Sequence, residues 1–436
     1  MGIANDDPLE AQTIDTMTVK NSEDSTRNNR LRAPIRIAIV VSHPIQHFAP
    51  LHRKLAQLPG VELKVFFCLN WGANSYFDHE FDTELQWDIP LLDGYAFEFL
   101  QGTQHIRKLR FGRVDNPSVG RALADFQPDV VQVFGYASRT MWRAARECNR
   151  KKIPVLLFSD SNAKARRPLW KRLVKTVVVG MFYRLVDGAL FIGDNNYDYH
   201  LRYGVPMERL FQGACPIDAE RLTLSAGDPV AARHEIRRRH AIPDDAFVAM
   251  FSGKLSARKS PTHLLSAIDR CAGHKGNIWA LLVGEGSERS QIEREIQEHK
   301  IRNVVLAGFV NQNSIAKYYA ASDVLVVPSA YDAHPLVLPE AGCFGLPVIA
   351  SDRIGCIGKS DTARVRENTL VYAYSDINAL TSCLVRLCED KGLYTAMSNS
   401  ARRIAATQDI SVAAVQVRDA AMTLKQLGRR KLGRRK

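Results

Sequence analysis

One stretch decides the fold: Ser329-Ala-Tyr-Asp-Ala-His-Pro-Leu-Val-Leu-Pro-Glu-Ala-Gly-Cys-Phe-Gly-Leu-Pro-Val-Ile-Ala-Ser351. It follows the apolar run Asp323-Val-Leu-Val-Val-Pro328 and ends in a second run, Pro347-Val-Ile-Ala350. Short runs rich in Val and Ile are typical of buried parallel strands. We therefore expect a strand, then a loop with a short helix, and then a second parallel strand.

Pro339 locates the start of the predicted helix. Proline has no amide hydrogen, so it fits near the first turn, where amides have no helical partner. A start near Leu336 meets this condition. It leaves the amides of Leu336, Val337 and Leu338 pointing out of the carboxyl edge of the sheet. A helix N-terminus in this position is an anion site, most often for phosphate.

Two carboxylates and a histidine surround this helix start. Asp332 and His334 lie in the loop before it, and Glu340 lies in its opening turns. We expect one carboxylate to face a ligand cleft and the other to reach a hydroxyl-bearing part of the same ligand. The alternative is that Glu340 is a surface residue, as glutamates on helices more often are.

Strand and helix patterns alternate outward from this stretch. Strands are expected at 35–41, 61–67, 130–134, 154–158 and 189–192, and again at 247–252, 279–283 and 304–307. Such alternation implies parallel strands joined by helical crossovers. We predict an α/β protein with two doubly wound, Rossmann-like domains that face each other across a cleft. Ligands are then expected at the carboxyl ends of the strands.

Changes in composition suggest the domain boundaries. Residues 219–244 are charged and have no strand pattern, so they end one domain and lead to the next. The predicted order is a disordered segment 1–33, a first Rossmann-like domain 34–240, a second 241–410, a C-terminal helix 411–428 and a basic tail 429–436. The irregular, aromatic-containing residues 69–115 are interpreted as long loops near the mouth of a site.

The overall composition is that of a globular enzyme. The chain has 436 residues, of which 46% are apolar and 24% charged. The eight cysteines are scattered, so we expect reduced thiols in a cytoplasmic protein and no zinc site. Residues 1–33 have no apolar region, so no secretory signal is expected. The apolar run 176–193 is interrupted by Arg184 and Asp187, which argues against a spanning helix.

Much of the net charge of +13 is concentrated in two basic clusters. The first comprises Lys164, Arg166, Arg167, Lys171, Arg172 and Lys175, and the second comprises Lys425, Arg429, Arg430, Lys431, Arg434, Arg435 and Lys436. The first cluster leads into a helix with Trp170, Leu173 and Val177. Two interpretations stay open: a cationic helix on an anionic membrane surface, or a solvated face beside a core stripe. The second cluster is interpreted as a membrane or nucleic-acid patch or as a solvated tail. Aromatics are not interleaved with it, so no specific nucleic-acid partner is expected.

Three further loops carry polar residues at the predicted cleft. The loop Gly253-Lys-Leu-Ser-Ala-Arg-Lys-Ser260 offers Lys254 and Lys259 to a diphosphate, or is simply a solvated basic loop. His43 and His47 follow the first strand, and Asp160 follows a later one. Each either contacts a substrate or only packs its loop. Gly284-Glu-Gly286 is interpreted as a tight turn, because the full Gly-x-Gly-x-x-Gly pattern is absent.

Together these motifs resemble those of the retaining GT-B glycosyltransferases of group 1, or family 4. The resemblance covers roughly residues 35–425. Its most specific part is Asp332 and Glu340, which resemble the acidic-x7-Glu motif of the family, followed by Gly342-Cys-Phe-Gly-Leu-Pro-Val-Ile-Ala-Ser351. Gly253 and Lys254 with Lys259 resemble the phosphate loop, and Gly308-Phe309 resembles a Gly-aromatic turn.

The resemblance implies a role for each of these residues. Glu340 is expected to bind the ribose hydroxyls of a nucleotide-sugar. Lys254 and Lys259, with the amides of Leu336 and Val337, are expected to balance the leaving diphosphate. Asp332, where the family usually has Glu, and His334 are expected to face the transferred sugar.

The chain also departs from the family pattern. The sequence Ser42-His-Pro-Ile-Gln-His47 replaces a glycine-rich first loop, and Phe134-Gly-Tyr-Ala-Ser138 lacks a histidine that many members carry. Asp160, His43 and His47 stay as alternatives for the missing catalytic group.

The function implied is sugar transfer from a nucleoside diphosphate sugar to an acceptor hydroxyl, with retention of configuration. The acceptor is expected to be a glycan or a lipid-linked glycan in polysaccharide or glycolipid assembly, bound by the first domain. No Asp-x-Asp motif occurs, so no metal and no other cofactor are expected. The alternatives are a nucleotide-sugar 2-epimerase of similar fold and a non-catalytic nucleotide-sugar-binding scaffold.

Overall fold

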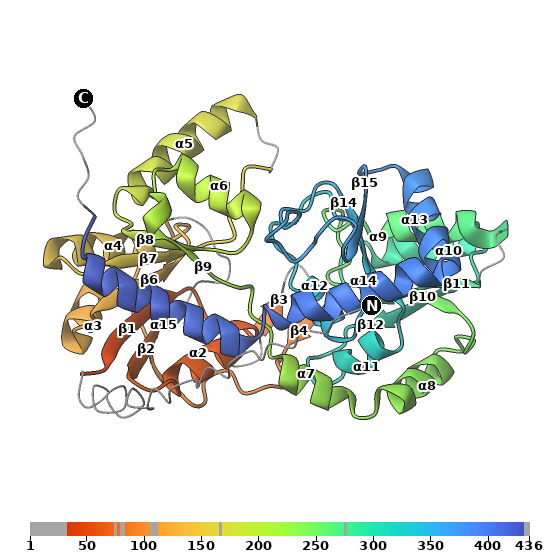
Figure 1. Cartoon of the computed structure of the whole chain (residues 1–436), viewed down its shortest axis with the longest axis horizontal. Coiled ribbons are helices and arrows are strands. Elements are labelled where there is room, and N and C mark those ends of the chain that lie inside the picture. Colours follow the sequence, from red (N-terminus) through yellow and green to blue (C-terminus); the bar gives the residue numbers. More distant parts are fainter. Residues whose placement is uncertain are drawn as a thin grey trace, which may run out of the picture. The chain divides into compact units, whose positions relative to one another are not determined.

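The computed structural model describes residues 33–73, 76–78, 83–103, 106, 112–164, 168–273 and 277–430. Residues 1–32, most of the segment expected to be disordered, lie outside this set. From Ile35 onward the chain forms one compact unit that holds two separate parallel sheets (Figure 1). Among the described residues, no helix is both long and apolar enough to cross a membrane.

The described part of the first sheet has seven parallel strands in the order β5-β2-β1-β6-β7-β8-β9. These are β1 (Ile35–Val41), β2 (Val61–Phe67), β5 (Ala96–Phe99), β6 (Val130–Phe134), β7 (Val155–Phe158), β8 (Gly188–Phe191) and β9 (Leu210–Gln212). The apolar runs from which strands were predicted in this half all form strands. The sequence did not predict β5 and β9, which are short strands at the two edges.

Alternating side chains of the first sheet build a core on each face. Ile37 of β1 and its neighbours at every second position face one cluster, whereas Ala38 and Val40 face the other. The helices that cover these faces are α2 (Phe48–Ala56), α3 (Val119–Phe126), α4 (Arg139–Lys151), α5 (Leu169–Tyr183), α6 (Asp194–Arg202) and α15 (Ile410–Leu427). Burial on both faces explains why the central strands contain almost no polar residues.

The described part of the second sheet has six parallel strands in the order β12-β11-β10-β13-β14-β15. These are β10 (Phe247–Ser252), β11 (Ile278–Val283), β12 (Val304–Gly308), β13 (Val324–Val327), β14 (Val348–Ser351) and β15 (Thr369–Tyr372). Its helices are α7 (Ala219–Ala226), α8 (Pro229–Arg239), α9 (Pro261–Arg270), α10 (Arg289–Glu298), α11 (Ile315–Ala320), α12 (Val337–Cys343), α13 (Ile377–Glu389) and α14 (Lys391–Ala406). Here too the core lies on both faces of the sheet.

The stretch that begins at Ser329 has the predicted structure. The strands β13 and β14 pair in parallel, with Leu325 opposite Val348. Helix α12 lies between them in the sequence and has Leu336 as its N-cap, which confirms the start expected from Pro339. Gly342 lets α12 pack closely on α14, because a Cβ at this position would lie 2.9 Å from the carbonyl oxygen of Ala401.

The region 69–115 is less irregular than expected. It contains β5 and an antiparallel pair of short strands, β3 (Tyr76–Asp78) and β4 (Thr83–Leu85). The buried amide of Asn116 donates hydrogen bonds to the carbonyl oxygens of Cys68, Leu100 and Gln101, at 3.2, 3.1 and 2.9 Å. Long-range polar contacts of this kind order the segment without a repeating apolar pattern.

The chain passes between the two halves at two adjacent places. Ile217 accepts a hydrogen bond from the amide of Ile410 (2.9 Å), and its own amide donates to the carbonyl oxygen of Gln408 (3.0 Å). Beyond this point α15 lies along the first sheet (Figure 1). Arg429 then forms an ion pair with Asp187, and the amide of Arg430 donates to the same carboxylate at 2.7 Å. These two residues of the predicted basic tail therefore contact the fold, whereas residues 431–436 lie outside the described residues.

Candidate functional site

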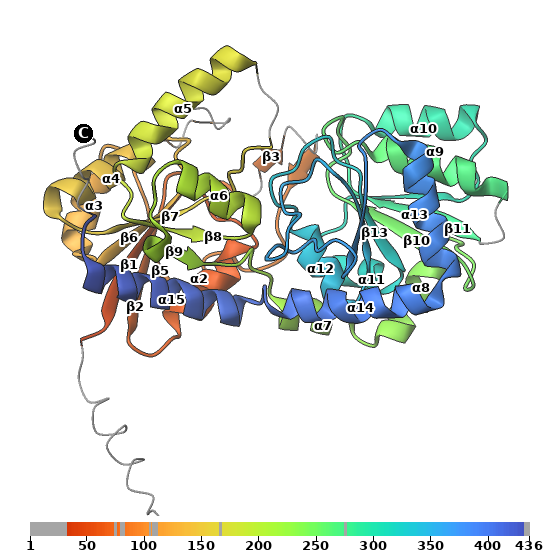
Figure 2. The ribbon, with the colours of Figure 1, turned by 45° about the horizontal axis from the view of Figure 1, so that its top comes forward.

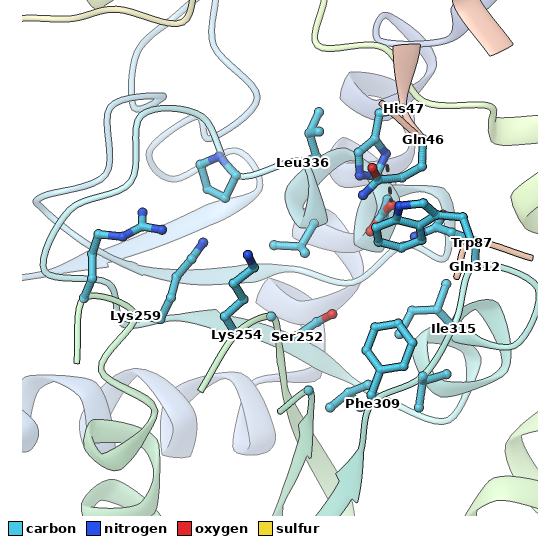
Figure 3. A pocket seen from close by; sticks show the side chains of 18 residues that line it. Gln46, His47, Trp87, Ser252, Lys254, Lys259, Phe309, Gln312, Ile315 and Leu336 are labelled. Atoms are coloured by element: carbon cyan, nitrogen blue, oxygen red, sulfur yellow. Dashed lines mark ion pairs between the residues drawn. The ribbon is translucent and has the colours of Figure 1, made fainter. Parts of the chain in front are cut away.

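Loops at the carboxyl ends of both sheets enclose a cavity of about 260 Å³ (Figure 3). The first half contributes Gln46, His47 and Trp87 to its lining. The second half contributes Ser252, Gly253, Lys254, Arg258, Lys259, Val283, Gly284, Phe309, Val310, Gln312, Ile315, Pro335, Leu336, Val337 and Glu340. The cavity therefore lies where ligands bind in doubly wound sheets.

The loop after β10 is held tightly against the loop after β11. A Cβ on Gly284 would lie 1.9 Å from the carbonyl oxygen of Gly253, and one on Gly286 would lie 2.5 Å from that of Leu255. The amide of Leu255 also donates to the carbonyl oxygen of Glu285 at 2.8 Å. Both glycines are thus needed for close backbone packing, which agrees with their interpretation as a tight turn.

Three cations of the loop after β10 line one side of the cavity. Lys259 forms an ion pair with Asp332, which follows β13. Arg258 donates to the carbonyl oxygen of Tyr331 (3.4 Å) and accepts from the amide of Ala330 (2.8 Å) through its own carbonyl. Figure 3 shows Lys254 and Lys259 approaching from the same side. This arrangement suits an anionic group such as a diphosphate.

Glu340 also lines the cavity, next to His47, and is 6% exposed. The hydroxyl of Tyr319 donates to its Oε2 at 2.7 Å, and Nδ1 of His47 lies 3.7 Å from its Oε1 (dashed in Figure 3). Burial raises the pKa of Glu340 to about 7, although the Tyr319 hydrogen bond and the charge of Arg221 act in the opposite direction. Near neutral pH this carboxyl group therefore exists in both protonation states.

Arg221 supports the side of the cavity that contains Glu340. Its guanidinium donates to Oε1 of Gln312 (3.3 Å) and to the carbonyl oxygen of the same residue (3.4 Å). Burial, and then the charge of Arg221, lower the pKa of His47 to about 4. His47 is therefore a neutral imidazole at physiological pH, and its contact with Glu340 is not a full ion pair.

The start of α12 lies between these two sides. Leu336 and Val337 line the cavity, and Leu336 lies between the two lysines and His47 in the view of Figure 3. The cavity thus brings together six of the residues predicted to bind the donor, namely Gly253, Lys254, Lys259, Leu336, Val337 and Glu340.

Four other predicted residues lie outside the cavity lining. Nδ1 of His43 is 2.9 Å from Oγ of Ser42, and the His43 ring packs against Trp71. Asp332 is 8% exposed and reaches the cavity only through Lys259. The lining of the cavity therefore does not test the contact with the transferred sugar that was predicted for Asp332, or the catalytic role considered for His43.

His334 and Asp160 complete that group. Burial lowers the pKa of His334 to about 4 against the opposing charge of Asp332, and its Nε2 is 3.5 Å from Oγ1 of Thr362. Desolvation, and then the like charge of Asp332, raise the pKa of Asp160. Asp160 and Asp332 are therefore close enough to interact although they belong to different halves.

Several residues of the site were not predicted from the sequence. Tyr319 lies on α11 and Arg221 on α7, where nothing in the local pattern distinguishes them from packing and surface residues. Trp87 belongs to the irregular, aromatic-containing region 69–115, and its ring centroid is 6.4 Å from that of Phe309. Within the described residues, no group of three or more His, Cys, Asp or Glu side chains has the arrangement of a metal site.

Residues 86–88 also join the two halves beside the cavity. Nδ2 of Asn311 donates to the carbonyl oxygen of Gln86 at 2.7 Å, and Nδ2 of Asn313 donates to that of Asp88 at 2.8 Å. These contacts hold Trp87 against the loop after β12. The region interpreted as lying near the mouth of a site therefore supplies part of the cavity wall.

Comparison with known proteins places this geometry in context. Residues 232–404 match the model of the family described as glycosyl transferases group 1. A GDP-mannose-dependent alpha-mannosyltransferase of Mycobacterium tuberculosis is 26% identical over 246 residues, 54% of this chain and 58% of that protein. An uncharacterized glycosyltransferase of Methanocaldococcus jannaschii is 32% identical over 116 residues, 26% of this chain and 30% of that protein. The chain spans less than two thirds of either relative.

Solved structures resemble nearly the whole described fold. Sucrose-phosphate synthase of Thermosynechococcus elongatus has a TM-score of 0.66 at 20% identity, covering 90% of this chain and 99% of that one. Anabaena HepE in complex with UDP has a TM-score of 0.67 at 16% identity, covering 90% and 100%. At these identities the likeness establishes the fold alone. The expected architecture of two Rossmann-like domains, the GT-B fold, is confirmed.

Proposed function

We propose that this chain is a group 1 glycosyltransferase that moves a sugar from a nucleoside diphosphate sugar to an acceptor hydroxyl. The observation that carries the proposal is that Lys254, Arg258 and Lys259 line the same cavity as the buried Glu340. The family match over residues 232–404 includes all four residues, and a structural neighbour holds UDP. A diphosphate flanked by a sugar and a nucleoside matches this distribution of charge.

Each side of the cavity has its own task in this proposal. Glu340, in its ionised form, accepts hydrogen bonds from the ribose hydroxyls. Lys254 and Lys259 bind the diphosphate, with the amides of Leu336 and Val337 directed at the same group. Negative charge builds on the leaving diphosphate during the reaction. Cations already in place stabilise that charge without reorganisation, which is the main source of the rate enhancement.

In this proposal the transferred sugar lies beside Asp332. The ion pair between Lys259 and Asp332 ties a carboxylate for the sugar to a cation for the diphosphate. The transition state is oxocarbenium-like, as in glycoside hydrolysis, and the configuration is retained. His334 lies half-buried in the same loop, with Nε2 near Oγ1 of Thr362. Because the loop cations supply the positive charge, the reaction is proposed to need no metal.

The acceptor is proposed to enter on the side of the first half. The loop Ser42–His47 presents Gln46 and a neutral His47 to the cavity. His43 and Asp160 lie near the same edge, and they stay as candidates for a group that receives the acceptor proton. A glycan or lipid-linked glycan at the cytoplasmic side of a membrane is the acceptor class proposed.

The test is a panel of nucleoside diphosphate sugars, including UDP-glucose and GDP-mannose, in a thermal-unfolding assay with the full chain. A donor that binds the native state raises the melting temperature. The stabilising donor is then incubated alone and with glycan acceptors, and the products are analysed. Sugar transfer supports the proposal. An epimer formed from donor alone supports the 2-epimerase alternative, and donor binding without any turnover supports the scaffold.

A further inference from the structure

Helix α5 exposes an apolar face. Six large apolar side chains are more than half exposed: Leu169 (74%), Trp170 (63%), Leu173 (70%), Val174 (57%), Val177 (63%) and Met181 (51%). Leu169, Leu173 and Val177 form one row at intervals of four residues, and Trp170, Val174 and Met181 form the adjacent row, so all six lie on one broad face of the helix. An exposed apolar patch of this size marks an interaction surface rather than chance exposure.

Only the C-terminal turns of α5 are held by the fold. Val179, Phe182 and Tyr183 are its buried residues, and the ring of Phe182 packs against Trp142 with centroids 5.1 Å apart. Residues 168–174 are all exposed. Figures 1 and 2 both show the N-terminal part of α5, in yellow, projecting beyond the neighbouring helices. The interpretation of Trp170, Leu173 and Val177 as a core stripe is therefore wrong.

The surroundings of this face are strongly cationic. Between Ser161 and Val186 the sequence has no acidic residue, and it has seven basic ones. Of these, Lys171 and Arg172 are exposed on the projecting turns, and Nζ of Lys171 lies 5.2 Å from the centroid of the Trp170 ring. Arg166 and Arg167 lie outside the described residues. The helix thus combines an apolar stripe with positive charge.

We propose that α5 docks this protein on a bilayer that contains anionic lipid. Leu, Val, Met and Trp side chains insert at the boundary of head groups and acyl chains, while Lys and Arg pair with the anionic head groups. A nucleic acid would use the cations but not the aliphatic stripe. A protein partner would use the stripe, but would need an acidic rim to match the charge. With 15 residues, α5 lies on the membrane and does not span it.

The position of α5 determines which edge of the protein faces the bilayer. The helix follows β7 through a loop that begins at the carboxyl edge of the first sheet, where Asp160 lies. In this loop, Nζ of Lys164 donates to the carbonyl oxygen of Ile354, at 3.2 Å, in the second half. Docking through α5 therefore brings the cleft edge near the bilayer. A lipid-linked acceptor would then reach the cavity from the membrane, and this consequence rests on the proposed function.

The first experiment is co-sedimentation of the full chain with phosphatidylcholine vesicles, with and without phosphatidylglycerol. The triple variant Leu169→Ser, Leu173→Ser, Val177→Ser removes half of the stripe. The matched control is Met207→Ser with Leu224→Ser, two apolar residues that are equally exposed elsewhere, at 67% and 72%. We expect the wild type and the control to bind vesicles that contain phosphatidylglycerol, and the triple variant to lose at least tenfold in partition coefficient, since each buried CH2 contributes about 0.8 kcal/mol.

A charge variant tests the electrostatic part separately. Lys171→Gln with Arg172→Gln is expected to lower binding by about fivefold for each cation, because one cation near an anionic surface contributes about 1 kcal/mol. Unfolding curves of all variants are expected to match the wild type, since the substituted side chains are exposed. Vesicle binding needs no turnover, so its result is independent of the proposed transferase activity.

Three outcomes would overturn the proposal. The first is equal vesicle binding by the wild type and the triple variant. The second is binding that does not depend on phosphatidylglycerol. The third is a concentration-dependent dimer, detected by light scattering, that the triple variant abolishes while vesicle binding is absent. That result would assign α5 to a contact between two copies of the chain.

Discussion

The two halves are both parallel sheets covered by helices, but they contribute unequally to the cavity. The second half supplies the cations of the loop after β10, the start of α12 and Glu340, whereas the first half supplies Gln46, His47 and Trp87. The polar groups of the second half are fixed by contacts within it, such as the Lys259–Asp332 ion pair and the hydrogen bond from Tyr319 to Glu340. The comparison shows that most polar groups of the cavity are held in position by contacts within the second half, and that the first half completes the cavity wall.

The largest effect is expected from Lys259→Met. Loss of a preorganised cation at the leaving group should lower kcat by about 10²–10³-fold, by analogy with removal of one oxyanion donor. Initial rates with saturating donor measure this effect. Lys391→Met, an exposed lysine on α14, is the control and should keep its rate. An unchanged kcat in Lys259→Met would mean that the second half does not organise the departure of the diphosphate.

The second prediction concerns pH and stability. The pKa of Glu340 is raised to about 7, so the folded protein keeps a proton that the unfolded chain releases near pH 4.5. Stability from this group is therefore full below pH 4.5 and is lost as the pH rises through 7, by about 3 kcal/mol in total. Denaturant unfolding from pH 4.5 to 8 measures it.

The Glu340→Gln variant isolates this contribution. Asp361, with a pKa also raised to about 7, titrates in the same window, and His47, with a pKa lowered to about 4, acts in the opposite direction at lower pH. The difference between wild type and variant removes the effect of Asp361, whereas His47, which lies 3.7 Å from Glu340, is coupled to the substitution. A difference that is flat with pH would show that Glu340 is ionised throughout.

Glu340→Gln should also weaken donor binding. A hydrogen bond to an ionised carboxylate contributes about 1.5–3 kcal/mol, so we expect the Kd to rise at least about tenfold at pH 8. Wild-type affinity should itself rise with pH through 7, while the affinity of the variant stays level. Calorimetry with the donor identified by thermal unfolding measures both. Glu298→Gln, on the exposed face of α10, is the control.

The smallest effect on the donor is expected from Gln46→Ala in the first half. Gln46 lines the cavity without a fixed role in the proposed binding of diphosphate or ribose, so donor Kd should change by about twofold or less. The KM for the acceptor should rise instead. A tenfold loss of donor affinity would contradict the proposal that the second half binds the donor and the first half binds the acceptor.

The parts of this molecule that the sequence predicts are those set by local pattern. The strands β13 and β14 follow from their Val and Ile content, and the start of α12 follows from the chemistry of Pro339. Gly253, Lys254 and Lys259 after β10 were predicted because residue type and position at the strand end carry the information.

The parts that were missed depend on contacts between distant segments. The hydroxyl of Tyr319 donates to Glu340 from a different helix. The charge of Arg221 lowers the pKa of His47 from a segment whose sequence predicts only a surface helix. The edge strands β5, β9 and β15 are each three or four residues long, so their apolar pattern is too short to read. The exposure of α5 depends on how far the helix extends beyond the sheet, which no local pattern encodes.

The return of the chain to its first half has a consequence for synthesis on the ribosome. One face of the first sheet is covered by Ala413, Ala414, Val417, Ala420, Ala421 and Leu424 of α15. Domains of a nascent chain usually fold in the order in which they emerge. Here the first half cannot close its apolar surface until the second has been translated. A growing chain would therefore expose the apolar side chains of β1 and α2 for most of its elongation. During this time the apolar surface available to a holding chaperone would be largest.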